Sequence, residues 1–178
     1  MHSSAPMRRL VGQAMPVMRR FTNAAEQACH LVKYDRGDLV VIAQVEAPGY
    51  WGVTIRVGAQ IGLVNSGSGH VLLAFASNEE RALMFEEHDT MRYEVQPPDL
   101  PARLEEVVQQ GYEAMQSQQT PTVWNLSVPI FGPNGTVLAA LTCPFVRRLE
   151  NAAAPDLDSV LALLRTASDE LSVTSAAT

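Results

Sequence analysis

Two apolar runs flank a short turn in the second half of the chain: Val123-Trp-Asn-Leu-Ser-Val-Pro-Ile-Phe131, Gly132-Pro-Asn-Gly135 and Thr136-Val-Leu-Ala-Ala-Leu-Thr-Cys143. The runs are rich in β-branched and other apolar residues, and the turn contains Pro, Asn and Gly, which favour chain reversal. This pattern is typical of an antiparallel β-hairpin. Because successive side chains of a strand point to opposite faces, we expect Trp124 and Asn125 to point in opposite directions.

A second hairpin is predicted near the N-terminus. The β-rich runs 28–34 and 39–46 flank the turn Asp35-Arg-Gly-Asp38, which is a hairpin signal. After a loop at 47–52, Val53-Thr-Ile-Arg-Val57 alternates apolar with polar residues. That alternation predicts a third antiparallel strand.

Helices are predicted between and beside these strands. Apolar spacings and capping residues place them at 7–21, in a short apolar segment ending at Phe75, at 77–85, at 100–110 and at 156–171. Pro16 predicts a kink or a break in the first helix, and Asp99 is positioned to cap the fourth. Hairpins with helices between them and at both ends predict an α+β fold, a curved antiparallel sheet with helices packed on it.

The charge balance bears on what the chain binds. It has 178 residues, the size of one domain, and 13 Lys+Arg against 19 Asp+Glu give a net charge of −6. An acidic chain is a poor candidate for binding nucleic acid by itself. The segment 77–113 carries most of the negative charge, whereas 7–20 holds four Arg and no acid. No apolar run is long enough for a membrane span or a signal peptide, and two cysteines make no disulfide framework, so a cytoplasmic location is expected.

Sites for catalysis or cofactors find little support. The histidines lack metal-ligand spacing, no phosphate-binding loop is present, and Ser66 lacks the G-x-S-x-G pattern, so we expect no metal and no cofactor. His30 and His70 are expected to be hydrogen-bonded and partly buried. Cys143 leaves one enzymatic alternative open, a thiol-dependent reaction, which needs an accessible thiolate with a low pKa. A dimerisation module without a ligand is a further alternative.

The segment Asn65-Ser-Gly-Ser-Gly69 precedes the short apolar helix. Exposed backbone N–H groups at a helix start can hold an anion, and glycine allows close approach, so a small carboxylate would need no Arg or Lys there. The alternative is that these glycines only let the helix pack tightly on the sheet. The pattern does not decide between the two.

The stretch Val57-Gly-Ala-Gln-Ile-Gly-Leu-Val-Asn-Ser-Gly-Ser-Gly-His-Val-Leu-Leu-Ala-Phe75 resembles the effector-binding domain of IclR-type transcriptional regulators, whose motif there is V-G-x-x-x-P-L-H-A-[ST]-A-x-G-K-A-x-L-A-F. Gly111-Tyr112 and Val128-Pro-Ile-Phe-Gly-Pro-Asn-Gly135 match as well, so the similarity runs from about Met7 to Leu171. The resemblance implies a GAF-like domain at 22–178 after an N-terminal extension and linker helix at 1–21. The family's DNA-binding winged helix-turn-helix is expected to be absent, in an excised domain or a natural stand-alone sensor.

The resemblance also implies a small-molecule pocket between the sheet and the glycine-bearing loop. The predicted lining residues are Tyr50, Val53, Ile61, Asn65, Ser66, Gly67, Ser68, Met115, Asn125, Thr142 and Pro144. Tyr50, Trp51 and Trp124 are candidate aromatic walls. The sequence departs from the family pattern around this pocket, with Gly62 for Pro, Val64 for His or Tyr, Asn65 for Ala and His70 for Lys. Ligand identity is therefore not inherited.

Together these observations predict a regulatory domain that senses a small organic acid or related metabolite. Binding is expected to shift the arrangement of subunits in a homodimer or homotetramer and so to control a separate DNA-binding domain. The expected partners are the effector, further copies of the chain and, only through the absent domain, DNA. No membrane partner is expected.

Overall fold

The computed structural model describes residues 4–49, 53, 55–91 and 94–176. Its centre is an antiparallel sheet in the order β3-β2-β1-β6-β5-β4. The strands are β1 (Cys29–Asp35), β2 (Asp38–Val45), β3 (Gln60–Ile61), β4 (Glu113–Gln116), β5 (Val123–Phe131) and β6 (Val137–Val146). The helices are α1 (Ala5–Ala25), α2 (Gly67–Phe75), α3 (Asn78–Met91), α4 (Leu100–Gln110) and α5 (Leu157–Ala176).

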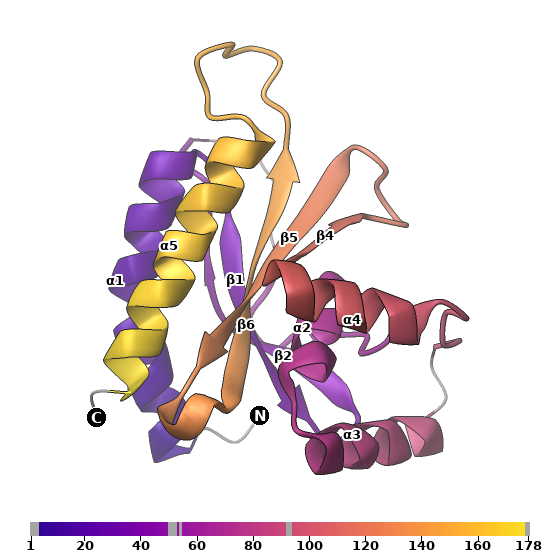
Figure 1. The fold of residues 1–178 in the computed structure, drawn as a ribbon. Coiled ribbons are helices and arrows are strands. Elements are labelled where there is room, and N and C mark those ends of the chain that lie inside the picture. Colours follow the sequence, from indigo (N-terminus) through magenta and orange to yellow (C-terminus); the bar gives the residue numbers. More distant parts are fainter. Residues whose placement is uncertain (1–3, 50–52, 54, 92–93, 177–178) are drawn as a thin grey trace.

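Helices cover both faces of the curled sheet, and each face has its own apolar core (Figure 1). On one face α1 and α5 lie side by side and bury, among others, Met18, Phe21 and Leu164 against β1, β5 and β6. On the other face α2 and α4 pack with β1 and β2, and Leu73 and Leu104 lie in that second core. The predicted α+β class with a curved antiparallel sheet is confirmed.

Both predicted hairpins are present. In β5 and β6, Val128 pairs with Leu141, and in β1 and β2, Leu31 pairs with Ala43. The predicted third strand is wrong. Val53 and 55–57 form no strand, and among the described residues between β2 and α2 the only strand is Gln60–Ile61, which pairs with β2. Their alternation arises because Val53 and Ile55 turn toward a cavity, so it does not reflect sheet pairing.

The helices are longer than predicted at several ends. α1 is one continuous helix with Pro16 exposed inside it, so the proline does not break the helix. α3 runs to Met91 instead of ending near residue 85. α4 has the predicted bounds and ends at Gly111 with φ +85°, but the Asp99 side chain makes no capping hydrogen bond. Across the described residues, no helix combines the length and apolar character that a bilayer crossing demands.

Candidate functional site

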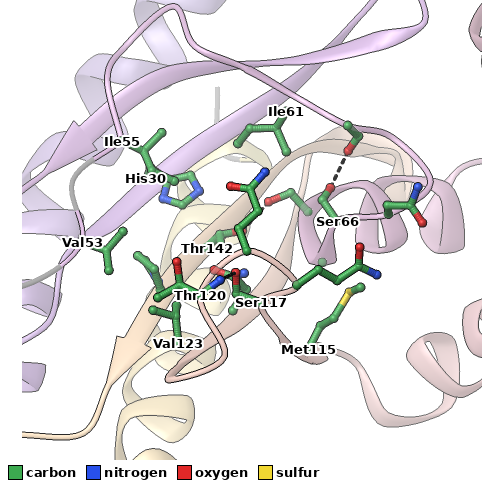
Figure 2. A pocket seen from close by; sticks show the side chains of 18 of the residues that line it. His30, Val53, Ile55, Ile61, Ser66, Met115, Ser117, Thr120, Val123 and Thr142 are labelled. Carbon is green, nitrogen blue, oxygen red and sulfur yellow. Dashed lines mark hydrogen bonds between the residues drawn. The ribbon is translucent and has the colours of Figure 1, made fainter. Parts of the chain in front are cut away.

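A cavity of about 540 Å³ lies between the sheet, the start of α2 and the loop after β4 (Figure 2). Of the eleven predicted pocket residues, Tyr50 falls outside the described residues, as does Trp51. The other ten all line this cavity: Val53, Ile61, Asn65, Ser66, Gly67, Ser68, Met115, Asn125, Thr142 and Pro144. They come from distant parts of the chain, and the sheet brings them together.

Strand alternation sorts the residues of β5 as expected. Asn125 faces the cavity, whereas Trp124 is 39% exposed and does not line it. Trp124 therefore forms no aromatic wall of the pocket. In β4, which the sequence did not predict, Met115 pairs with Asn125 across the ladder and lines the same cavity.

The start of α2 is built around Ser66 and Gly69. Ser66 Oγ accepts a hydrogen bond from the Gly69 N–H at 3.0 Å and donates one to the Gly62 carbonyl, which caps the helix and ties it to the preceding loop. A Cβ at Gly69 would lie 1.8 Å from the Leu63 carbonyl oxygen. Gly69 thus lets α2 lie close to the loop that precedes it, which differs from the packing on the sheet that was one of the two alternatives for this segment.

The same loop also holds a carboxylate, and it belongs to the chain itself. Glu94 accepts hydrogen bonds from the backbone N–H groups of Leu63 at 2.7 Å and of Val64 and Asn65 at 3.1 Å. His88 Nε2 lies 3.1 Å from the Glu94 carboxylate. We call the N–H groups of residues 63–65 the anion cradle; it lies just before the helix start at which the sequence predicted an anion site, and shares only Asn65 with it.

Behind the cradle, a buried polar cluster joins α2, α4 and β4. His70 Nδ1 lies 2.8 Å from Glu113 Oε2, and its Nε2 lies 2.8 Å from the Val64 carbonyl oxygen. Arg103 Nε donates to the same Glu113 oxygen at 3.0 Å. His70 and Glu113 are both buried. His70 is hydrogen-bonded, as predicted, and it holds the loop that carries the cradle.

Three hydroxyl groups line up beside the cavity. Thr142 Oγ1 lies 2.7 Å from Ser68 Oγ and 2.8 Å from Ser127 Oγ, and all three residues are buried. Each hydroxyl can both donate and accept a hydrogen bond. The bonds within this row of hydroxyls therefore determine whether Ser68 and Thr142 are left with a donor or an acceptor for a ligand.

His30 lines the cavity although the sequence indicated only a structural role (Figure 2). It lies opposite Thr142 in the β1–β6 ladder and is 3% exposed. Burial lowers the pKa of His30 to about 4, so the ring is neutral at pH 7 and can serve as donor or acceptor. No His30 partner was apparent in the sequence, because the pairing of β1 with β6 is not local.

Other lining residues were also missed. They include Gln60, Glu94 and the polar run Gln116-Ser-Gln-Gln-Thr120 after β4. This run is polar and carries no charge, and that composition is the sequence signal that could have identified it as part of a binding site. Among the described residues that line the cavity there is no Lys or Arg.

The structure does not favour the thiol-based alternative. Cys29 and Cys143 are both fully buried. Burial raises the pKa of Cys29 to about 12 and that of Cys143 well above its ordinary value, whereas a reactive thiolate needs exposure and a lowered pKa. Within the described part of the chain, no three His, Cys, Asp or Glu side chains are grouped to hold a metal ion.

Solved structures share this architecture. The C-terminal domain of the Escherichia coli transcriptional regulator KdgR superposes with a TM-score of 0.72 at 24% identity, over 92% of this chain and 96% of that one. Thermotoga maritima IclR gives a TM-score of 0.76 at 21% identity, over 94% of this chain and 70% of that one. The fold is thus that of the C-terminal domains of bacterial transcriptional regulators.

The sequence comparisons identify the family. Residues 3–173 match the family described as bacterial transcriptional regulator IclR C-terminal, and the chain belongs to it. The HTH-type transcriptional regulator KdgR of Escherichia coli K12 is 26% identical over 169 residues, which cover 92% of this chain. The chain spans 63% of that protein's length. The matched relative is a transcriptional regulator.

Proposed function

We propose that the chain is an effector-binding domain that takes a small polar molecule into the cavity beside α2. The observation that carries the proposal is the convergence of ten predicted lining residues on one cavity. Such sites are concave and mostly apolar, with a few placed polar groups. Here Val53, Ile61 and Met115 supply apolar surface, while Asn125 and Thr142 supply polar groups.

Membership of a family of transcriptional regulators supports a proposal for the regulatory output. Ligand binding would favour one of two subunit arrangements of a homodimer or homotetramer, because a ligand shifts an equilibrium by its differential affinity for the two states. That shift would control DNA binding by a separate N-terminal domain in the cytoplasm. An organic acid was the ligand class expected from the sequence, with its carboxylate at the helix start in Asn65–Gly69. Of the backbone N–H groups in that segment, the one of Asn65 donates to Glu94, together with those of Leu63 and Val64 just before it.

A thermal-shift screen tests the ligand site. Small carboxylates, aromatic acids and neutral polar metabolites are added to the wild type and to Asn125→Ala, with Asn23→Ala, an exposed residue of α1 on the opposite face of the sheet, as the matched control. We expect at least one compound to raise the Tm of the wild type and of Asn23→Ala, and to lose much of its effect with Asn125→Ala. A response that Asn125→Ala leaves intact, or a complete lack of response, contradicts the proposal.

The oligomeric change has its own measurement. Sedimentation velocity with and without the stabilising compound should show a shift in the distribution of species. Identical distributions would remove the proposed rearrangement while leaving the ligand site in place.

A further inference from the structure

We propose that Glu94 is a built-in carboxylate that occupies the anion cradle of the cavity and restricts the ligand to uncharged polar molecules. The proposal rests on the proposed function, because it names the ligand class of the same cavity. It makes Glu94 a residue that determines specificity, although it lies on the segment between α3 and α4.

The contacts of Glu94 are those of a bound ligand. Its two carboxylate oxygens receive three backbone N–H groups in succession, from residues 63, 64 and 65, at 2.7 to 3.1 Å. Hydrogen bonds to an ionised acceptor are roughly twice as strong as neutral ones. The side chain is only 14% exposed, and His88, which is also buried, contacts it from α3. The Glu94 carboxylate therefore occupies all three N–H groups of the cradle, and its covalent attachment to the chain gives it a high effective concentration there.

Gly62 is the position that makes room for this carboxylate. A Cβ built at Gly62 would lie 2.1 Å from Glu94 Oε2 and 2.5 Å from its Cδ, far inside contact distance. Any other residue at 62, including the Pro of the family's motif, would therefore push the carboxylate away from its present place. Gly62 and Glu94 form a matched pair, and both line the cavity.

The rest of the lining does not compensate for the negative charge. No Lys or Arg is present among the described lining residues, and His30 is neutral at pH 7 because burial lowers its pKa to about 4. A ligand carboxylate would meet Glu94 without a cationic partner and without the backbone donors that Glu94 already uses. Like charges held close together in one site repel each other.

The groups that remain suit a neutral ligand. Side-chain amides of Gln60, Gln116 and Asn125 and the hydroxyls of Ser117 and Thr120 line the cavity, and each both donates and accepts hydrogen bonds. Ligand hydroxyl, carbonyl and amide groups match this set. The inferred class is an uncharged polyhydroxy or amide-bearing compound.

The test measures the affinity for acetate at constant ionic strength, with chloride as the reference salt, in the wild type, Glu94→Ala and Gly62→Ala. Titration is followed by the backbone amide NMR signals of residues 63–65. We expect saturable shifts of these signals in Glu94→Ala, with acetate bound about 10- to 100-fold more tightly than in the wild type, the factor of one lost charge-assisted hydrogen bond. Gly62→Ala should show no such gain, because its Cβ would lie where the carboxylate sits. Glu105→Ala, which removes an exposed carboxylate of α4, should behave as the wild type.

Three results would overturn the inference. One is acetate binding by the wild type as tight as in Glu94→Ala. Another is no gain of acetate binding in Glu94→Ala when circular dichroism shows that this variant is folded. The third needs no variant: wild-type affinity for D-gluconate that exceeds its affinity for the matched uncharged polyol D-glucitol.

Failure of this inference is distinguishable from failure of the proposed function. A carboxylate that binds the wild-type cavity tightly, and depends on Asn125, overturns the role of Glu94 but supports the effector site. Conversely, acetate binding gained by Glu94→Ala in a protein that no metabolite stabilises supports the cradle and counts against the effector site.

Discussion

The buried cluster of His70, Glu113 and Arg103 makes the most demanding prediction for stability. His70→Leu keeps an apolar side chain of similar size but removes both bonds of the ring, to Glu113 and to the Val64 carbonyl. The Glu113 side chain is 2% exposed, so water does not replace the lost partner. A buried charge would be left with Arg103 as its remaining side-chain partner in the cluster.

The expected loss is large for one substitution. Removing one partner of a buried pair costs about 3–5 kcal/mol, and because Arg103 stays in place we expect the lower end, about 3 kcal/mol. For a chain of this length, about 2–4 °C of Tm is lost per kcal/mol, so the Tm should fall by about 6–12 °C. The variant Glu113→Leu should be destabilised for a related reason, since it leaves His70 and Arg103 without their shared acceptor.

Urea unfolding followed by circular dichroism, at one fixed protein concentration, measures the free energy of unfolding. The control is Arg20→Ala, which breaks an exposed ion pair with Glu170 and should cost less than about 1 kcal/mol. The double variant His70→Leu, Glu113→Leu should lose less free energy of unfolding than the sum of the losses of the two single variants. A loss below about 1 kcal/mol for His70→Leu, or strict additivity, would refute the reasoning.

Three further predictions concern pH, packing and thiol reactivity. Burial lowers the pKa of His30 from an ordinary 6.5 to about 4, so between these pH values the unfolded chain binds a proton at His30 and the folded chain does not. The free energy of unfolding, measured by urea titration, should therefore fall by about 3 kcal/mol between pH 6.5 and 4, and by less in His30→Gln. Gly69→Ala drives a Cβ against the Leu63 carbonyl and should lower the Tm by several degrees in a thermal melt. Neither Cys29 nor Cys143 should react with a thiol reagent at pH 7 until the protein unfolds, as absorbance will report.

Each of these has a matched comparison. If His30→Gln loses as much free energy of unfolding between pH 6.5 and 4 as the wild type does, groups other than His30 cause that loss. Gly12→Ala in α1, where an added Cβ meets nothing within 4 Å, should be neutral or stabilising, and equal effects at Gly12 and Gly69 would rule out the proposed clash. Rapid labelling of Cys143 in the folded protein would reopen the thiol alternative.

Much of the architecture was predictable because its signals are local. The hairpin of β5 and β6 shows in two apolar runs around a Pro- and Gly-containing turn, and α4 shows in apolar spacing that stops at Gly111. The opposite orientation of Trp124 and Asn125 follows from strand alternation alone. Where the strand prediction failed, the alternation of Val53 and Ile55 reflected a cavity wall and not a ladder.

Tertiary structure alone decided what the cavity presents to a ligand. The contact of Glu94 with Leu63 joins residues 31 apart, that of His70 with Glu113 joins residues 43 apart, and that of Ser68 with Thr142 joins residues 74 apart. Composition and periodicity determine which segments become helices and strands, since those depend on neighbours a few residues away. Which backbone N–H groups stay available, which histidine becomes neutral and whose carboxylate fills the cradle depend on side chains that only the folded sheet and its helices bring together.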